Sequence, residues 1–200
     1  SPDGRQLCFV GYSGGISDLY LCDLDGKNLR RLTNDRYADK DPNWSPDGTR
    51  IIFSTDRGPD TDFDLWRIDP QLIAEIDVAT GVVTPLPNMA GKNICPYWSP
   101  DGHKVLFVSD RSGIPNLYIQ TVDGDSAGDI RQITDLLTGV SGITDGSPPL
   151  SVSRDGKRLV FSAFQKAGWD LFAMKDPFNR PAVIPRGRLL AAPTAADSAA

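Results

Sequence analysis

Short apolar runs separated by polar turns follow one another along the chain. The run VLFV at 105–108 is apolar at every position and lies between the turn sequences SPDG (99–102) and DRSG (110–113). Runs of this length that are rich in β-branched and aromatic residues are typical of strands. Because the run does not alternate between apolar and polar residues, both faces of its sheet are predicted to be buried.

One supersecondary unit occurs four times. Its turn SPDG begins at Ser1, Ser45 and Ser99, and it recurs as SRDG at Ser153. Aligned on this turn, the second strand of every copy carries a phenylalanine: Phe9, Phe53, Phe107 and Phe161. The third strand of every copy is predicted to carry a leucine followed by an aromatic residue: Leu19, Leu65, Leu117 and Leu171. The second copy needs a two-residue insertion before Asp64 to keep this match.

Four-stranded units that recur at roughly 40 to 50 residues are typical of a β-propeller, in which sheets pack face to face around an axis. We therefore predict an all-β fold: a β-propeller fragment of about four four-stranded antiparallel blades. The first blade is expected to lack its inner strand, because the chain begins at a turn. The predicted propeller spans 1–184, with blades at about 1–37, 38–90, 91–143 and 144–184. A helical solenoid is excluded because 19 Gly and 16 Pro leave no apolar-periodic window long enough for its helices.

Two segments are less regular. In the second blade, Leu65–Ile68 is predicted as the third strand and 69–75 as part of an irregular excursion, with an outer strand at 82–86; a third strand at 76–80 is the alternative. In the fourth blade, 179–184 is a candidate last strand. Residues 185–200 are rich in Ala and Pro and are predicted to form a disordered linker or tail.

Several motifs carry a family resemblance. The sequence PNWSPDG at 42–48, the run IIFS at 51–54, DLY at 18–20 and LT at 32–33 resemble the repeat of TolB-type β-propellers of bacterial cell envelopes, over about residues 1–176. The resemblance implies a non-catalytic scaffold in the periplasm or cell envelope. It also implies a protein or peptide partner, such as an envelope lipoprotein or an outer-membrane protein. The same repeat occurs in the substrate-gating propellers of prolyl-oligopeptidase-like hydrolases, which is the alternative function.

Charge and hydropathy exclude other partners. The 21 Lys and Arg against 26 Asp and Glu give a net charge of −5, and no basic stripe is present. Nucleic acid and anionic membrane surfaces are therefore poor candidates. No run of 18 apolar residues is present, so no membrane-spanning helix is predicted.

Candidate catalytic groups are few. Gly11–Gly15 (GYSGG) matches the G-x-S-x-G pattern around Ser13, but that motif requires a strand-to-helix turn, and here another strand is expected to follow. The only histidine, His103, follows a blade turn and is expected at the surface. Neither a Ser-His-Asp triad nor a multi-histidine metal site is available. We therefore predict no enzyme activity and no cofactor.

Cysteines and clustered aspartates give two further hypotheses. Cys8 and Cys22 lie on predicted neighbouring strands, where a disulfide is conceivable, but the matching positions in other copies are apolar, so three free buried thiols, Cys95 included, are favoured. Asp60, Asp62 and Asp64 resemble half of a calcium loop without its distal Glu. A solvated loop is favoured there, and no metal site is predicted.

The candidate binding site follows from the direction of the strands. The inner strand of each blade is assigned to the residues before each SPDG turn, so the starts of these strands form the opposite mouth of the channel. These starts do not repeat as the core does, which is typical of functional loops. We predict a polar protein-binding mouth with one aromatic anchor, formed by Asp39, Asp41, Asn43, Asn93, Tyr97 and Asp145. A water-filled rim without a partner is the alternative.

Overall fold

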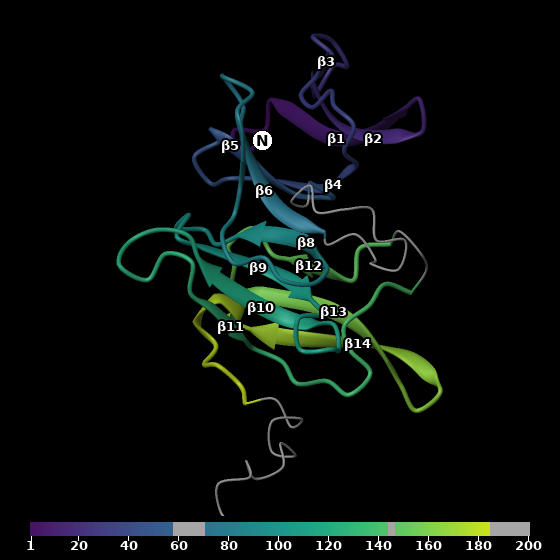
Figure 1. Ribbon diagram of the computed structural model, residues 1–200, viewed down its shortest axis with the longest axis vertical. Helices are drawn as coiled ribbons and strands as arrows, with labels where there is room; N and C mark the ends of the chain where they lie inside the picture. The colour runs from purple at the N-terminus through teal and green to yellow at the C-terminus, as the bar shows by residue number, and fades with distance from the viewer. Residues whose placement is uncertain (58–70, 144–146, 185–200) are drawn as a thin grey trace, which may run out of the picture.

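The computed structural model describes residues 1–57, 71–143 and 147–184, and these residues form an almost purely β structure. Four antiparallel sheets follow one another along the chain, from the N-terminal hairpin at one end of Figure 1 to the β13–β14 hairpin near the other. We call them blades 1 to 4 in chain order. This arrangement confirms the predicted all-β propeller architecture.

The blades contain these elements. Blade 1 has β1 (Gln6–Ser13), β2 (Ile16–Asp23) and β3 (Arg30–Arg31). Blade 2 has β4 (Asp39–Trp44), β5 (Arg50–Thr55), β6 (Leu72–Asp77) and β7 (Val83–Pro85). Blade 3 has β8 (Asn93–Trp98), β9 (Lys104–Ser109), β10 (Asn116–Thr121) and β11 (Ile130–Gln132). Blade 4 has β12 (Leu150–Val152), β13 (Arg158–Gln165) and β14 (Gly168–Lys175), followed by the 3-10 helix η1 (Pro177–Asn179).

The SPDG turns are held by their own side chains. In blade 2 the Ser45 hydroxyl donates to the Asp47 carboxylate at 2.6 Å and accepts the backbone N–H of Arg50 at 2.9 Å. The turn places Gly48 at a φ of 73°, a left-handed conformation that glycine adopts without steric cost. Blades 3 and 4 form the same serine–aspartate bond. The motif therefore repeats because each copy closes the same hairpin between its first and second strands.

Adjacent blades bury their apolar faces against each other. Three clusters of buried side chains lie between blades 1 and 2, 2 and 3, and 3 and 4. Phe53, Phe107 and Phe161 are buried in these clusters, as the alignment predicts, whereas Phe9 is 40% exposed. Phe9 differs because it lies on the face of blade 1 that points away from blade 2. The repeated phenylalanines are thus contacts between blades, and burying each contributes about 1.5–3 kcal/mol.

The third strand of blade 2 differs from the prediction. Leu65–Ile68 lies outside the described residues, and β6 pairs with β5 instead, with Phe53 opposite Ala74 and Ser54 opposite Ile73. In blade 3 the corresponding pair is Val108 and Leu117. Ile73 therefore takes the place predicted for Leu65, and the insertion in this blade is longer than two residues. The outer strand β7 lies within the predicted range 82–86.

The end of the described chain also differs from the prediction. No strand forms at 179–184; the backbone N–H of Val183 instead donates to the carbonyl of Gln132 on β11, at 2.9 Å. The predicted tail at 185–200 and the aspartates at 60, 62 and 64 lie outside the described residues. Within the described part, no helix is long and apolar enough to cross a membrane.

The register of blade 1 explains why its cysteines are free. Cys8 lies opposite Leu21, and Cys22 lies opposite Leu7. Since side chains alternate between the two faces of a strand, the two thiols point to opposite faces of the sheet. Cys8, Cys22 and Cys95 are all free, as predicted; Cys22 and Cys95 are buried, whereas Cys8 is only partly buried.

Candidate functional site

The inner strands of blades 2 and 3 share a β-bulge. Their register against the second strands shifts between Lys40 and Asn43 in β4, and between Ile94 and Tyr97 in β8. Within each shift one non-glycine residue has a positive φ: Asp41 at 55° and Cys95 at 53°. Such a conformation costs on the order of 1–3 kcal/mol. A bulge re-aims the side chains around it, and here it does so at the same position in two successive blades.

The bulges connect the two inner strands. One oxygen of the Asp41 carboxylate accepts the Ser54 hydroxyl at 3.0 Å and the backbone N–H of Cys95 at 3.2 Å. Further along, the Asn43 side-chain oxygen accepts the backbone N–H of Trp98 at 3.3 Å. Side chains of β4 thereby satisfy N–H groups on the edge of β8 that have no partner strand.

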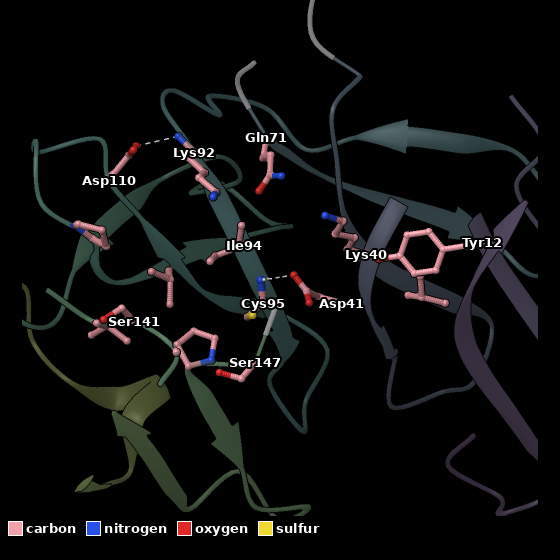
Figure 2. A pocket seen from close by; sticks show the side chains of 16 residues that line it. Tyr12, Lys40, Asp41, Gln71, Lys92, Ile94, Cys95, Asp110, Ser141 and Ser147 are labelled. Atoms are coloured by element: carbon pink, nitrogen blue, oxygen red, sulfur yellow. Dashed lines mark hydrogen bonds between the residues drawn. The ribbon is translucent and has the colours of Figure 1, made fainter. Parts of the chain in front are cut away.

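A cavity of about 500 Å³ lies beside these bulges, where the inner strands begin. It is at the end of the blades remote from the SPDG turns. About half of its lining is apolar: Val10, Ile94, Cys95, Val108, Pro115, Val140 and Pro149. Polar side chains line the rest, among them Tyr12, Lys40, Asp41, Gln71, Lys92 and Asp110 (Figure 2). This hollow lies at the end of the strands where the binding mouth is predicted, and the binding role stays a prediction.

Asp39 is not placed as predicted for a binding residue. Its side chain is 0% exposed and forms an ion pair with Arg57 from the loop after β5. Burial raises the pKa of Asp39, and the hydrogen bond from Arg57 opposes that rise. The guanidinium of Arg57 also lies over the Phe53 ring, 5.5 Å from its centroid. Asp39 therefore holds blade 2 together and is closed to a partner.

Asn93 occupies in blade 3 the position that Asp39 has in blade 2, and its side chain is likewise buried and hydrogen-bonded within the chain. It is fully buried, and its amide donates to the carbonyls of Gln71 at 2.9 Å and Gly91 at 3.0 Å. Its oxygen accepts from Arg111 at 3.2 Å, and Arg111 lies over the Phe107 ring. Asp39 and Asn93 are thus equivalent anchors for an arginine, which corrects their assignment as binding residues.

The other four predicted binding residues differ in where they lie. Asp41 is half-buried and lines the cavity. Asn43 is engaged by the Trp98 backbone. Tyr97 packs against the apolar cluster between blades 3 and 4, where burial raises its pKa, and it is absent from the described lining of the cavity. Asp145 lies outside the described residues. Among the described residues, Asp41 alone of the predicted set reaches the hollow.

Three residues of the cavity were missed from the sequence. Lys40 is the second residue of β4, Lys92 immediately precedes β8, and Gln71 immediately precedes β6. Figure 2 shows the side chains of Lys40 and Lys92 reaching toward one hollow, with Gln71 between them. One signal in the sequence could have found them. The later positions of these strands repeat closely between blades, but polar residues replace apolar ones where the strands begin.

The groups considered for catalysis lie apart from one another. Ser13 ends β1 and pairs with Ile16 across a tight hairpin, so the G-x-S-x-G match is a strand-to-strand turn. His103 lies at the SPDG end, where its Nδ1 is 2.6 Å from the carboxylate of Asp123. Within the described ranges, no group of three or more His, Cys, Asp or Glu side chains is arranged to hold a metal ion.

Known proteins resemble this chain in sequence and fold, although no family model matches it. A TolB homolog of Chlorobium chlorochromatii is 34% identical over 158 residues, which cover 79% of this chain and 31% of that protein. A TolB homolog of Chlorobaculum tepidum is 32% identical over 121 residues, or 60% of this chain and 25% of that protein. The chain thus spans about a third or less of the length of these relatives.

Solved structures agree on the fold. The crystal structure of TolB from Acinetobacter baumannii superposes with a TM-score of 0.64 at 24% identity, over 88% of this chain and 39% of that one. A prolyl endopeptidase structure superposes with a TM-score of 0.53 at 16% identity, over 86% of this chain and 27% of that one. At such identities a superposition shows the fold alone. Together with the serine–aspartate turns, the phenylalanine contacts between blades and the sequence relatives, these likenesses support a TolB-type β-propeller family for this chain.

Proposed function

We propose that this chain is part of a non-catalytic propeller scaffold that binds a protein or peptide at the mouth where its inner strands begin. The observation that carries the proposal is the cavity of about 500 Å³, whose lining combines apolar side chains with charged ones. A concave site with apolar walls and a few convergent polar groups is the usual form of a binding pocket.

The divergence of the repeat supports this choice of mouth. The residues that close turns and separate blades recur in each copy, because packing constrains them in the same way. At the cavity, Lys40 and Asp41 of blade 2 correspond to Ile94 and Cys95 of blade 3. Binding residues are commonly found at variable positions carried by a rigid scaffold.

The cellular setting of the proposal rests on the family. TolB-type propellers imply the periplasm or the cell envelope and a protein partner there, such as an envelope lipoprotein or an outer-membrane protein. The likeness to a prolyl endopeptidase is a likeness of fold, and no observation at the cavity favours the gating of a hydrolase. We therefore propose the scaffold alone.

The experiment fills the cavity without touching the blades. Ser141 lines the hollow, and its hydrogen bonds with Ser162 use its backbone N–H and carbonyl, so Ser141→Trp adds bulk where only a side chain changes. Ser126→Trp makes the same change in the exposed loop between β10 and β11, at the SPDG end. Envelope proteins captured by the wild-type chain should be lost with Ser141→Trp and kept with Ser126→Trp. Equal capture by all three proteins would place binding elsewhere.

A further inference from the structure

Two lysine side chains, Lys40 and Lys92, line the cavity. Lys40 and Lys92 are both exposed, and each lies at the start of an inner strand. Among the residues that the structure describes, no carboxylate forms an ion pair with either. The described lining of the hollow therefore holds two lysine cations without a described ion-pair partner, beside the carboxylates of Asp41 and Asp110.

Among the described lining residues, Asp41 and Asp110 are the carboxylates, and both accept hydrogen bonds from the chain itself. Asp110 accepts the backbone N–H of Lys92 at 2.7 Å. Asp41 accepts from Ser54 and from the backbone of Cys95, as described above. Both carboxylates therefore fix the strand starts, and among the described residues neither forms an ion pair with Lys40 or Lys92 (Figure 2).

The third polar group completes a donor set. Gln71 lies between the lysines, and its side-chain amide offers two N–H donors. Two ammonium groups and one amide can together satisfy the oxygens of a carboxylate, and charge-assisted bonds of this kind are stronger than neutral ones. Next to this set the wall is apolar, with Ile94 and Val108.

From this juxtaposition we propose that Lys40, Lys92 and Gln71 form a carboxylate-binding subsite, and that the partner enters as an extended peptide whose carboxylate meets this subsite while an apolar side chain contacts Ile94 and Val108. This inference rests on the proposed function and adds the chemistry of the ligand. The carboxylate is supplied either by an Asp or Glu side chain or by the C-terminus of the partner.

Random peptide libraries test the chemistry without a known partner. The full chain is used to select from two phage-displayed libraries, one with peptides joined through their C-termini and one with free C-termini. Enrichment of Asp or Glu in the first library identifies a side-chain carboxylate. Enrichment only in the second, without Asp or Glu, identifies a terminal carboxylate.

Matched variants then tie the result to the lysines. A selected peptide should bind the double variant Lys40→Gln/Lys92→Gln about tenfold more weakly, since two partly exposed ion pairs of somewhat under 1 kcal/mol each sum to about 1.4 kcal/mol. Gln71→Leu should weaken binding less. Lys27→Gln/Lys157→Gln removes the same charge at the SPDG end and should leave the affinity unchanged. Affinity should also fall with added salt for the wild type and far less for the first double variant.

The outcomes separate the two proposals. Selected peptides that lack enriched carboxylates, or that bind both double variants equally, overturn the carboxylate subsite while leaving a peptide-binding mouth in place. If Ser141→Trp fails to reduce binding of the selected peptides, or if neither library yields a binder, the binding mouth itself is overturned.

Discussion

The carboxylate of Asp41 accepts the backbone N–H of Cys95 at 3.2 Å, across the boundary between blades 2 and 3. The two residues occupy the same bulge position of successive repeats, and both have a positive φ. This bond lets a side chain of blade 2 satisfy an N–H on β8, the edge strand of blade 3. It also holds the strand starts that form the candidate binding mouth.

Removal of that acceptor should destabilise the chain. Asp41→Ala removes one acceptor from the N–H of Cys95, which keeps the Ser54 hydroxyl at 3.2 Å, and removes the acceptor of that hydroxyl. We therefore expect a loss of about 1 kcal/mol in the free energy of unfolding. Asp41→Asn keeps an oxygen at the position and should cost less. Urea denaturation of the two variants measures the difference, and equal losses would mean that the bond contributes little.

The phenylalanine contacts between blades give a second test, with a control inside the repeat. Phe107 is fully buried between blades 2 and 3, so Phe107→Ala should lower the free energy of unfolding by about 3–5 kcal/mol. Phe9 has the same position in blade 1 but is 40% exposed, so Phe9→Ala should cost clearly less. Denaturation midpoints in urea that shift equally would contradict the assigned blade faces.

The repeat made the core predictable, because turn and packing residues act locally and recur. Phe53 and Phe107 could be identified from the alignment alone. The third strand of blade 2 could not be identified in this way. Leu65 and Trp66 match the motif in sequence, but the strand that pairs with β5 is β6. Strand pairing is a tertiary choice that overrides a local match.

The binding site was harder to predict for a related reason. Asp39 and Asn93 look like exposed polar residues at strand starts, but Arg57 and Arg111 from later loops pair with them and close them off. A polar residue has the same sequence signal whether it serves a partner or its own chain. The bulges gave no signal either, because Asp41 and Cys95 adopt a positive φ without being glycine.

His103 provides a pH-dependent prediction. The hydrogen bond to Asp123 raises the pKa of His103 above its ordinary value of 6.5. Because the folded-state pKa is raised, the stabilisation is fully present below the unfolded-state pKa and is lost as pH rises through the folded-state pKa. NMR titration of the single histidine should give a pKa above 6.5 that falls in Asp123→Asn. An unchanged midpoint in that variant would show that the pair does not form in solution.

The thiols should react slowly in the native protein. Burial raises the pKa of Cys8 to about 12, and burial together with the nearby Asp41 also raises the pKa of Cys95. Since the thiolate is the reactive species, Ellman's reagent at pH 8 should modify Cys8 and Cys95 slowly until the chain is unfolded. Denaturation without reductant should release three reactive thiols; one thiol would reveal a disulfide that the strand register excludes.

The mouth itself can be examined by photo-cross-linking in cells that contain the protein. A benzoylphenylalanine in place of Ser141 lines the cavity, and the same residue in place of Ser126 lies at the opposite, SPDG end. We predict that a partner protein is cross-linked from position 141 and not from position 126, and that Lys40→Gln/Lys92→Gln reduces its yield. A partner cross-linked from position 126 with none from position 141 would contradict the assignment of the binding mouth.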